Sequence, residues 1–408
     1  MNRNNALTAT LVWLILILTF LSRADSSMIQ SNSPLFAHAL GARLAEVGLV
    51  TSVYAVVTLL VRFGYSASVP LAKIPRIMTW GFMFLVVSVL IMLLSEDFWQ
   101  LLVGVGLSGV STALVMPHLL SLMGGLSTPD QRERNLSYYS LALSSSLVVA
   151  PIIGTLMLTR FPLRSLYVLL LVFAILALVA MIWYQPALTL HLSQGINSAP
   201  KIGLRDTMRD LWRNRIYMNS FWALFLFNLS FAAAMTYGGV DIKQHFHLPY
   251  VMVELVLTSF FVVSLLGRLL IARFARKGQL TKKATLIFWA LGVGALGLVL
   301  MGWSPNLPVF ITGFWLLGWP HAALFPLITM RIASNVGKSQ LVAANTLAQS
   351  SFNLSGTFGP LVLGIVAEYG SLGLGFWIIA LLQLVAMGVV YWETRDERRL
   401  ASMGQQAG

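Results

Sequence analysis

The sequence has 408 residues, of which 57% are hydrophobic and only 10% are charged, and its mean hydropathy is +0.79. Soluble domains carry about 25% charged residues, so this composition excludes a water-soluble protein and predicts an integral membrane protein. The sequence contains no cysteine, which excludes disulfide bonds, thiolate metal sites and a cysteine nucleophile. We expect no metal and no cofactor.

Apolar segments long enough to cross a bilayer recur along the whole sequence. A hydrocarbon core of about 30 Å needs roughly 20 helical residues, and lipid cannot satisfy exposed backbone groups, so helices are expected. The first segment lacks a small-residue cleavage site, so we expect it to be retained. The twelve predicted spans are 7–31, 46–64, 77–95, 98–124, 136–158, 164–185, 217–239, 251–272, 284–303, 306–330, 341–367 and 371–392.

The second half of the sequence repeats features of the first at a spacing of about 206 residues. Arg62 recurs as Arg268, and the dipeptide Pro117-His118 recurs as Pro320-His321. With 15 Pro and 6 His in 408 residues, chance predicts about 0.2 such dipeptides, so an internal repeat is indicated. A duplicated membrane protein predicts a transporter of two pseudo-symmetric six-helix bundles. The other matched positions are Thr79 and Thr285, Leu141-Ala142 and Leu347-Ala348, and Pro151 and Pro360.

The longest polar segment, from Gln185 to Arg215, divides the two halves. Its basic and acidic residues are spaced as in a short amphipathic helix on a membrane surface. We therefore predict an N-terminal bundle at 1–185, a cytoplasmic linker at 186–216, a C-terminal bundle at 217–394 and a cytoplasmic tail at 395–408.

The basic residues predict the orientation. Placing both termini in the cytoplasm puts 22 of the 27 Lys and Arg on that side, as the positive-inside rule requires. The rule explains the net charge of +13 without nucleic acid, although a basic surface also attracts anionic lipid headgroups. We expect a monomeric, multi-pass protein of the plasma membrane.

The fourth and fifth predicted helices and the loop between them carry a series of motifs. These are Gly109-Val110-Ser111-Thr112-Ala113 through Pro117, then Pro129-Asp130-Gln131-Arg132, then Ala150-Pro151-Ile152-Ile153-Gly154. In this order they resemble the major facilitator superfamily, and the resemblance covers nearly the whole chain. It implies twelve helices, alternating access and no enzymatic activity. Asp25, followed nine residues later by Pro34, resembles the first helix of the 12-helix drug:proton antiporters.

Two features of those relatives are missing. Their loop between helices two and three carries an acid, but Pro70 stands at that place and Arg276 at its repeat. Val105 replaces the Arg that the antiporters carry in helix four. The acid-based latch of the family is therefore not expected, and only basic gating candidates remain. These candidates are Arg62, Arg268, Arg76 and Arg273.

Asp25 is the only one of the 14 acidic residues that we place well inside a predicted span, with Glu254 and Glu368 near span ends. A carboxylate there costs about 2.5–3.5 kcal/mol on insertion scales, so it is usually kept for a function. Because a low dielectric disfavours the charged form, Asp25 is the candidate proton-coupling residue. The alternative is a structural partner for Arg23.

The candidate substrate-binding residues are Arg23, His118, His321 and Asn228. Arg23 is two residues from Asp25, about 200° around a helix, so the two do not face each other. Arg23 is either an anchor for an anion, since its planar fork holds carboxylate or phosphate, or one half of a gating salt bridge. The two histidines either bind substrate and share protons or pack beside prolines.

Proline and glycine mark a hinge in each half. Pro151 with Gly154, and Gly359 with Pro360, allow helices to bend and approach closely. The charges of the first helix, by contrast, are not repeated, because Phe231 and Leu229 stand 206 residues after Asp25 and Arg23.

The interpretation that joins these features is a secondary active transporter that exports a small amphipathic or drug-like compound in exchange for protons. The alternatives are uptake or exchange of a small organic anion, and a ligand sensor on a carrier scaffold that transports nothing. The sequence has no G-x-S-x-G, H-E-x-x-H or G-x-x-x-x-G-K-[ST] motif, so neither an enzyme nor an ATP-driven pump is expected.

Overall fold

The computed structural model describes residues 3–65, 73–127, 129–193, 204–276, 283–336 and 341–406, and these residues form helices without any strand. Twelve helices in these ranges are long and apolar enough to cross a membrane, as predicted, and the short α7 lies in the expected linker. The helices are α1 Arg3–Ala39, α2 Leu44–Tyr65, α3 Ile74–Leu94, α4 Phe98–Leu126, α5 Pro129–Leu158, α6 Ser165–Ser193, α7 Leu204–Arg213, α8 Arg215–His245, α9 Tyr250–Arg276, α10 Lys283–Trp303, α11 Leu307–Asn335, α12 Leu341–Tyr369 and α13 Leu372–Gln406.

The chain forms two compact units. The first unit contains residues 1–199 together with 247–258, and the second contains 200–246 and 259–408. The short stretch 247–258 includes the start of α9, so this helix contributes to both units. Residues that lie far apart in the sequence therefore share the first unit.

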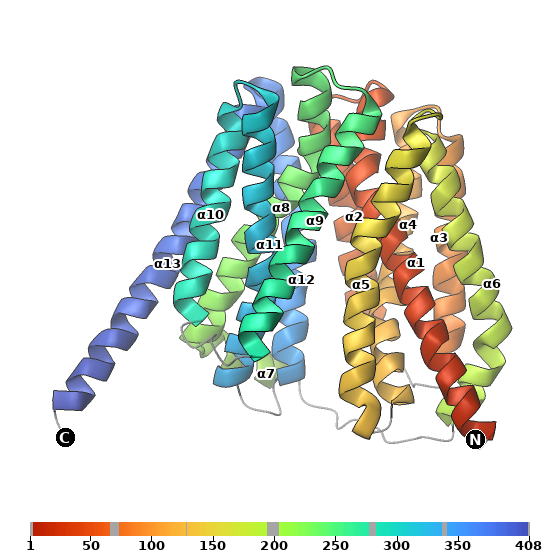
Figure 1. The fold of residues 1–408 in the computed structure, drawn as a ribbon, viewed down its shortest axis with the longest axis horizontal. Coiled ribbons are helices and arrows are strands. Elements are labelled where there is room, and N and C mark those ends of the chain that lie inside the picture. Colours follow the sequence, from red (N-terminus) through yellow and green to blue (C-terminus); the bar gives the residue numbers. More distant parts are fainter. Residues whose placement is uncertain are drawn as a thin grey trace. The chain divides into compact units, whose positions relative to one another are not determined.

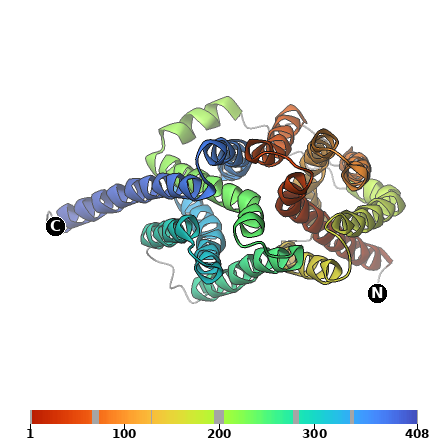
Figure 2. The ribbon, with the colours of Figure 1, turned by 90° about the horizontal axis from the view of Figure 1, so that it is seen from above.

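Corresponding helices pack on one another in the two units (Figures 1 and 2). In the first unit α1 packs on α4, α5 and α6, and in the second α8 packs on α11, α12 and α13. Likewise α3 contacts α4 and α6, while α10 contacts α11 and α13. Each matched pair of the sequence repeat thus falls on corresponding helices, with Pro117-His118 on α4 and Pro320-His321 on α11.

Helix α1 is longer than the sequence predicted, since it continues past residue 31 to Ala39. The added length carries the buried polar residues Asn32 and Ser33. Tyr167 on α6 donates a hydrogen bond to Ser33 Oγ (3.1 Å), and Ser31 Oγ donates to the carbonyl of Ser27 (3.2 Å). Tertiary contacts that satisfy these hydroxyls allow the helix to continue.

Two helix contacts depend on the absence of a side chain. A Cβ atom at Gly109 on α4 would lie 2.8 Å from the carbonyl oxygen of Tyr54 on α2. A Cβ atom at Gly359 on α12 would lie 2.8 Å from the carbonyl oxygen of Leu229 on α8. Both obstacles are backbone atoms, so a methyl group would force the helices apart.

We expect Gly359→Ala to destabilise the protein by about 1–3 kcal/mol, the usual effect of overpacking. The measurement is the apparent Tm of the purified full-length protein. Gly388→Ala on α13 is the control, because a Cβ atom there has nothing within 4 Å. Equal Tm values for the two variants would show that α8 and α12 do not need this close approach.

Candidate functional site

Asp25 lies on the buried face of α1 and is 0% exposed. Neither of its carboxyl oxygens has a hydrogen-bond partner within the part of the chain that the structure describes. A buried charge without partners is strongly unfavourable, so this geometry suits the neutral, protonated carboxyl group. Asp25 is therefore buried inside a membrane-spanning helix, as the sequence predicted.

Arg23 lies two residues before Asp25 and is partly exposed. The two side chains form no salt bridge with each other, unlike Arg43 and Glu46, which pair at 3.4 Å. The charge of Arg23 instead interacts with the phenol groups of Tyr54 on α2 and Tyr139 on α5. Among the described residues, no carboxylate pairs with Arg23.

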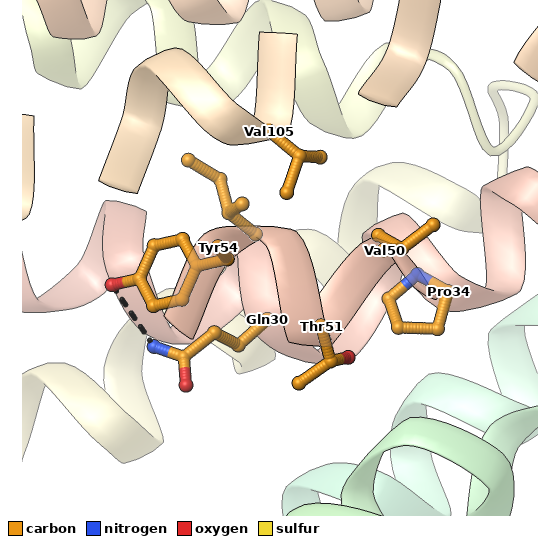
Figure 3. Close-up of a pocket in the computed structure, with 7 residues that line it drawn as sticks. Gln30, Pro34, Val50, Thr51, Tyr54 and Val105 are labelled. Atoms are coloured by element: carbon orange, nitrogen blue, oxygen red, sulfur yellow. Dashed lines mark hydrogen bonds between the residues drawn. The ribbon is translucent and has the colours of Figure 1, made fainter. Parts of the chain in front are cut away.

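Tyr54 connects three helices of the first unit (Figure 3). Its hydroxyl accepts a hydrogen bond from Gln30 Nε2 on α1 (3.3 Å) and donates one to Thr112 Oγ1 on α4 (3.0 Å). A recess of about 160 Å³ lies beside it and is lined by Ile29, Gln30, Pro34, Val50, Thr51, Tyr54 and Val105. The recess is nowhere wide enough for a water molecule, so it does not hold substrate in this conformation.

The two histidines of the repeat are both buried, on α4 and α11. The His321 ring stacks on Phe231 with centroids 4.4 Å apart, and Phe260 lies 5.3 Å away. Its Nδ1 is 2.7 Å from Ser264 Oγ on α9. These contacts hold the His321 ring on several sides, which favours the packing role among the two that the sequence left open.

Asn228 on α8 is also held by a neighbouring helix. Its Nδ2 donates to Ser351 Oγ on α12 (3.1 Å), while its Oδ1 has no hydrogen-bond partner among the described residues. The free oxygen leaves Asn228 able to accept a hydrogen bond from a ligand.

The hinge candidates lie at helix contacts. Gly154 on α5 faces α1, where a Cβ atom would lie 2.8 Å from Met28 Cε. Pro360 on α12 accepts a hydrogen bond at its carbonyl from the Tyr237 hydroxyl on α8 (3.0 Å). Pro151 and Gly359 are buried beside them.

The gating candidates differ in exposure. Arg62 and Arg268 are partly buried near the ends of α2 and α9, whereas Arg76 and Arg273 are exposed. Arg62 also interacts electrostatically with Tyr54, so two arginines flank this hydroxyl.

The sequence analysis missed two buried carboxyl groups. Glu254 was placed near a span end and Asp241 in a loop, but Glu254 is 1% exposed and Asp241 is 8% exposed. Helix α8 continues to His245, beyond the predicted end at 239, and so carries Asp241 inside the helix. Glu254 is buried because the start of α9 packs in the first unit. Hydropathy alone carries no signal for that packing.

Comparisons with known proteins agree with this architecture. A family model described as the major facilitator superfamily matches residues 15–241 and again 220–406. No curated protein sequence matches the chain significantly.

Solved structures share the fold at low sequence identity. A substituted form of the nucleoside transporter NupG has a TM-score of 0.76 and 12% identity, with 93% of this chain and 99% of that chain covered. A bacterial homolog of the human lysosomal transporter Spinster, inward-facing and occupied, has a TM-score of 0.71 and 11% identity, with 95% and 97% covered. The human organic anion transporter MFSD10 (TETRAN) has a TM-score of 0.60 and 17% identity, with 94% and 99% covered.

These identities show the fold alone, whereas the two matches of the family model overlap and together span residues 15–406. The chain therefore belongs to the major facilitator superfamily and is a membrane transporter of small molecules.

Proposed function

We propose that this chain is a proton-coupled transporter of a small organic anion, with Asp25 as the proton site and Arg23 as the anion anchor. The observation that carries the proposal is the separation of these two charges. They are two residues apart on α1, yet they form no salt bridge, and only Arg23 is partly exposed.

Asp25 has the properties of a proton carrier rather than those of a direct substrate contact. It is fully buried and its oxygens lack donors within the described residues, so a proton is the smallest ligand that can neutralise it. A conformation in which water reaches α1 would stabilise the carboxylate and let that proton leave. Alternating access of the two halves provides such a conformation.

Arg23 has the properties of an anion anchor. Its guanidinium offers up to five donors in a planar fork, and no carboxylate among the described residues pairs with it. Arg62 adds positive charge near Tyr54. One of the similar structures is described as an organic anion transporter, which agrees with an anionic substrate.

Export of an amphipathic or drug-like compound is the second candidate. It is supported by Asp25 and Pro34 at the antiporter spacing and by the aromatic surroundings of His321. It requires a substrate that tolerates the charge of Arg23. On either proposal the hinges on α5 and α12 accommodate the rocking of the two halves. The four basic gating candidates act at the cytoplasmic side, and both termini lie in the cytoplasm.

The first test concerns Asp25. In proteoliposomes with an imposed pH gradient, we expect Asp25→Asn to bind substrate but to lose gradient-driven accumulation, because the amide cannot carry a proton. The control is Asp97→Asn, since Asp97 caps the N-terminus of α4 at the protein surface. Unchanged dependence of Asp25→Asn on the gradient would disprove the proton assignment.

The second test concerns Arg23. A thermal-shift screen of mono- and dicarboxylates, organic phosphates, nucleosides and cationic dyes would first identify a ligand class. We then expect Arg23→Gln to weaken anion affinity by about 1.5–3 kcal/mol, the worth of hydrogen bonds to a charged group. Arg23→Lys should lose part of this affinity, because it keeps the charge without the fork.

The matched control is Arg160→Gln in the exposed turn after α5, which should bind like the unmodified protein. Unaltered anion affinity in Arg23→Gln, or stabilisation by cationic dyes alone, would favour the drug-like candidate.

A further inference from the structure

The start of α9 carries a buried carboxyl group that the proposed mechanism does not use. Glu254 Oε1 accepts a hydrogen bond from Asn32 Nδ2 on α1, with the two atoms 3.5 Å apart. Both residues belong to the first unit. A Cβ atom at Gly154 on α5 would lie 3.8 Å from the same oxygen, so the glycine leaves room for the carboxyl group.

Three buried oxygen atoms around this contact lack a hydrogen-bond partner among the described residues. They are Glu254 Oε2, Asn32 Oδ1 and Thr258 Oγ1. Thr258 lies one turn after Glu254, on the same face of α9. Other buried threonines donate back to a carbonyl of their own helix, as Thr19 does to Ile15 at 2.7 Å. Buried polar atoms are normally paired, so this group requires an explanation.

A single proton accounts for two of the three atoms. A protonated carboxyl group offers one donor and one acceptor, and the side-chain amide of Asn32 offers the same pair. With Asn32 Nδ2 donating to Oε1, a proton on Oε2 can be donated to Asn32 Oδ1, which closes a ring of two hydrogen bonds. Without the proton, Oε2 and Oδ1 are both acceptors and cannot bond to each other.

No basic side chain in the described ranges forms a salt bridge with Glu254. On the side of α6, Arg164 donates to the carbonyl of Ser95 (2.8 Å) and Tyr167 donates to Ser33. Further titratable groups on the packed elements include Asp25, Arg23 and His38 on α1, Arg134, Tyr138 and Tyr139 on α5, Tyr184 on α6, and Tyr250, Arg268 and Arg273 on α9. A deprotonated Glu254 would thus be a buried charge with a single hydrogen bond, which is unfavourable unless water reaches it.

We propose that Glu254 and Asn32 form a second proton-binding site, in which the proton holds the start of α9 against α1 and its loss releases that contact. The site goes beyond the proposed function, which assigns one proton to Asp25. Asn32 is seven residues after Asp25, two turns along the same face of α1, at a distance of about 10.5 Å. The two proton sites therefore lie in line on one helix.

The absence of cysteine makes thiol labelling a direct test. The reporter is Thr258→Cys in the full-length protein in lipid nanodiscs, where its side chain is buried beside Glu254. We expect maleimide labelling to be slow at low pH and to accelerate once Glu254 loses its proton. Glu96→Cys at an exposed position corrects for the ionisation of the thiol itself.

Two variants predict opposite results. Glu254→Gln preserves the ring in a form that cannot lose a proton, so labelling of Thr258→Cys should stay slow at high pH. At high pH we expect this labelling rate to be about tenfold lower than in the protein that keeps Glu254, because one pH unit changes the protonation ratio tenfold. Asn32→Leu removes the partner, so labelling should be fast even at low pH.

An unchanged pH profile in both variants would overturn the proposal. Slower labelling in sodium than in choline at constant high pH would also overturn it, because a metal cation would then be the ligand. The profile should persist in Asp25→Asn, whose own defect is gradient-driven transport. Failure of this site and failure of the Asp25 assignment are therefore separate outcomes.

Discussion

The burial of a polar face on α1 is the constraint on which the rest of the first unit depends. In an apolar surrounding, each of these groups needs a partner inside the protein. Ser31 finds it in the carbonyl of Ser27, and Ser33 in the hydroxyl of Tyr167. The bond from Tyr167 on α6 fixes the rotation of α1 about its axis, and that rotation turns Asp25 towards the protein interior. The buried polar residues of this helix are Thr19, Ser22, Asp25, Ser26, Ser27, Ser31, Asn32 and Ser33.

The second unit has the same helix packing as the first but carries no charged residues at the positions equivalent to Arg23 and Asp25. Phe231 stands 206 residues after Asp25, and its ring stacks on His321. Leu229 stands at the same distance after Arg23 and packs against Gly359. Both equivalent positions are thus used for packing. The repeat accounts for the shared framework, and the charges of α1 account for the difference between the halves.

The sequence was sufficient for the twelve spans and the burial of Asp25, because both depend on hydropathy over a whole helix, and for the repeat, because matched residues recur at one spacing. It was not sufficient for features that depend on one contact. The extension of α1 to Ala39 requires Tyr167 to reach Ser33 from α6. The burial of Glu254 requires the start of α9 to pack in the first unit. Glu254 is four residues into α9, where an acidic residue usually lies at the membrane–water interface. Its position in the sequence therefore gave no reason to expect it to be buried.

The sequence could not predict the environments of Arg23 and His321 either, since helical spacing gives the angle of a side chain but not its neighbours. Arg23 was predicted to point away from Asp25, and the two form no salt bridge, but its two tyrosine neighbours come from α2 and α5. His321 is enclosed by residues of α8 and α9 that no local pattern connects to it.

Two proton sites on α1, as proposed, would be coupled mechanically. If both Asp25 and the contact to Glu254 depend on α1, a movement that admits water to one site also displaces the other. Protonation at the Asn32 end then favours the conformation in which the start of α9 is held, while Asp25 determines whether α1 can remain buried. On this proposal each site exchanges its proton with water only when the movement exposes it, because groups about 10.5 Å apart on one helix are too far from each other for a direct proton transfer.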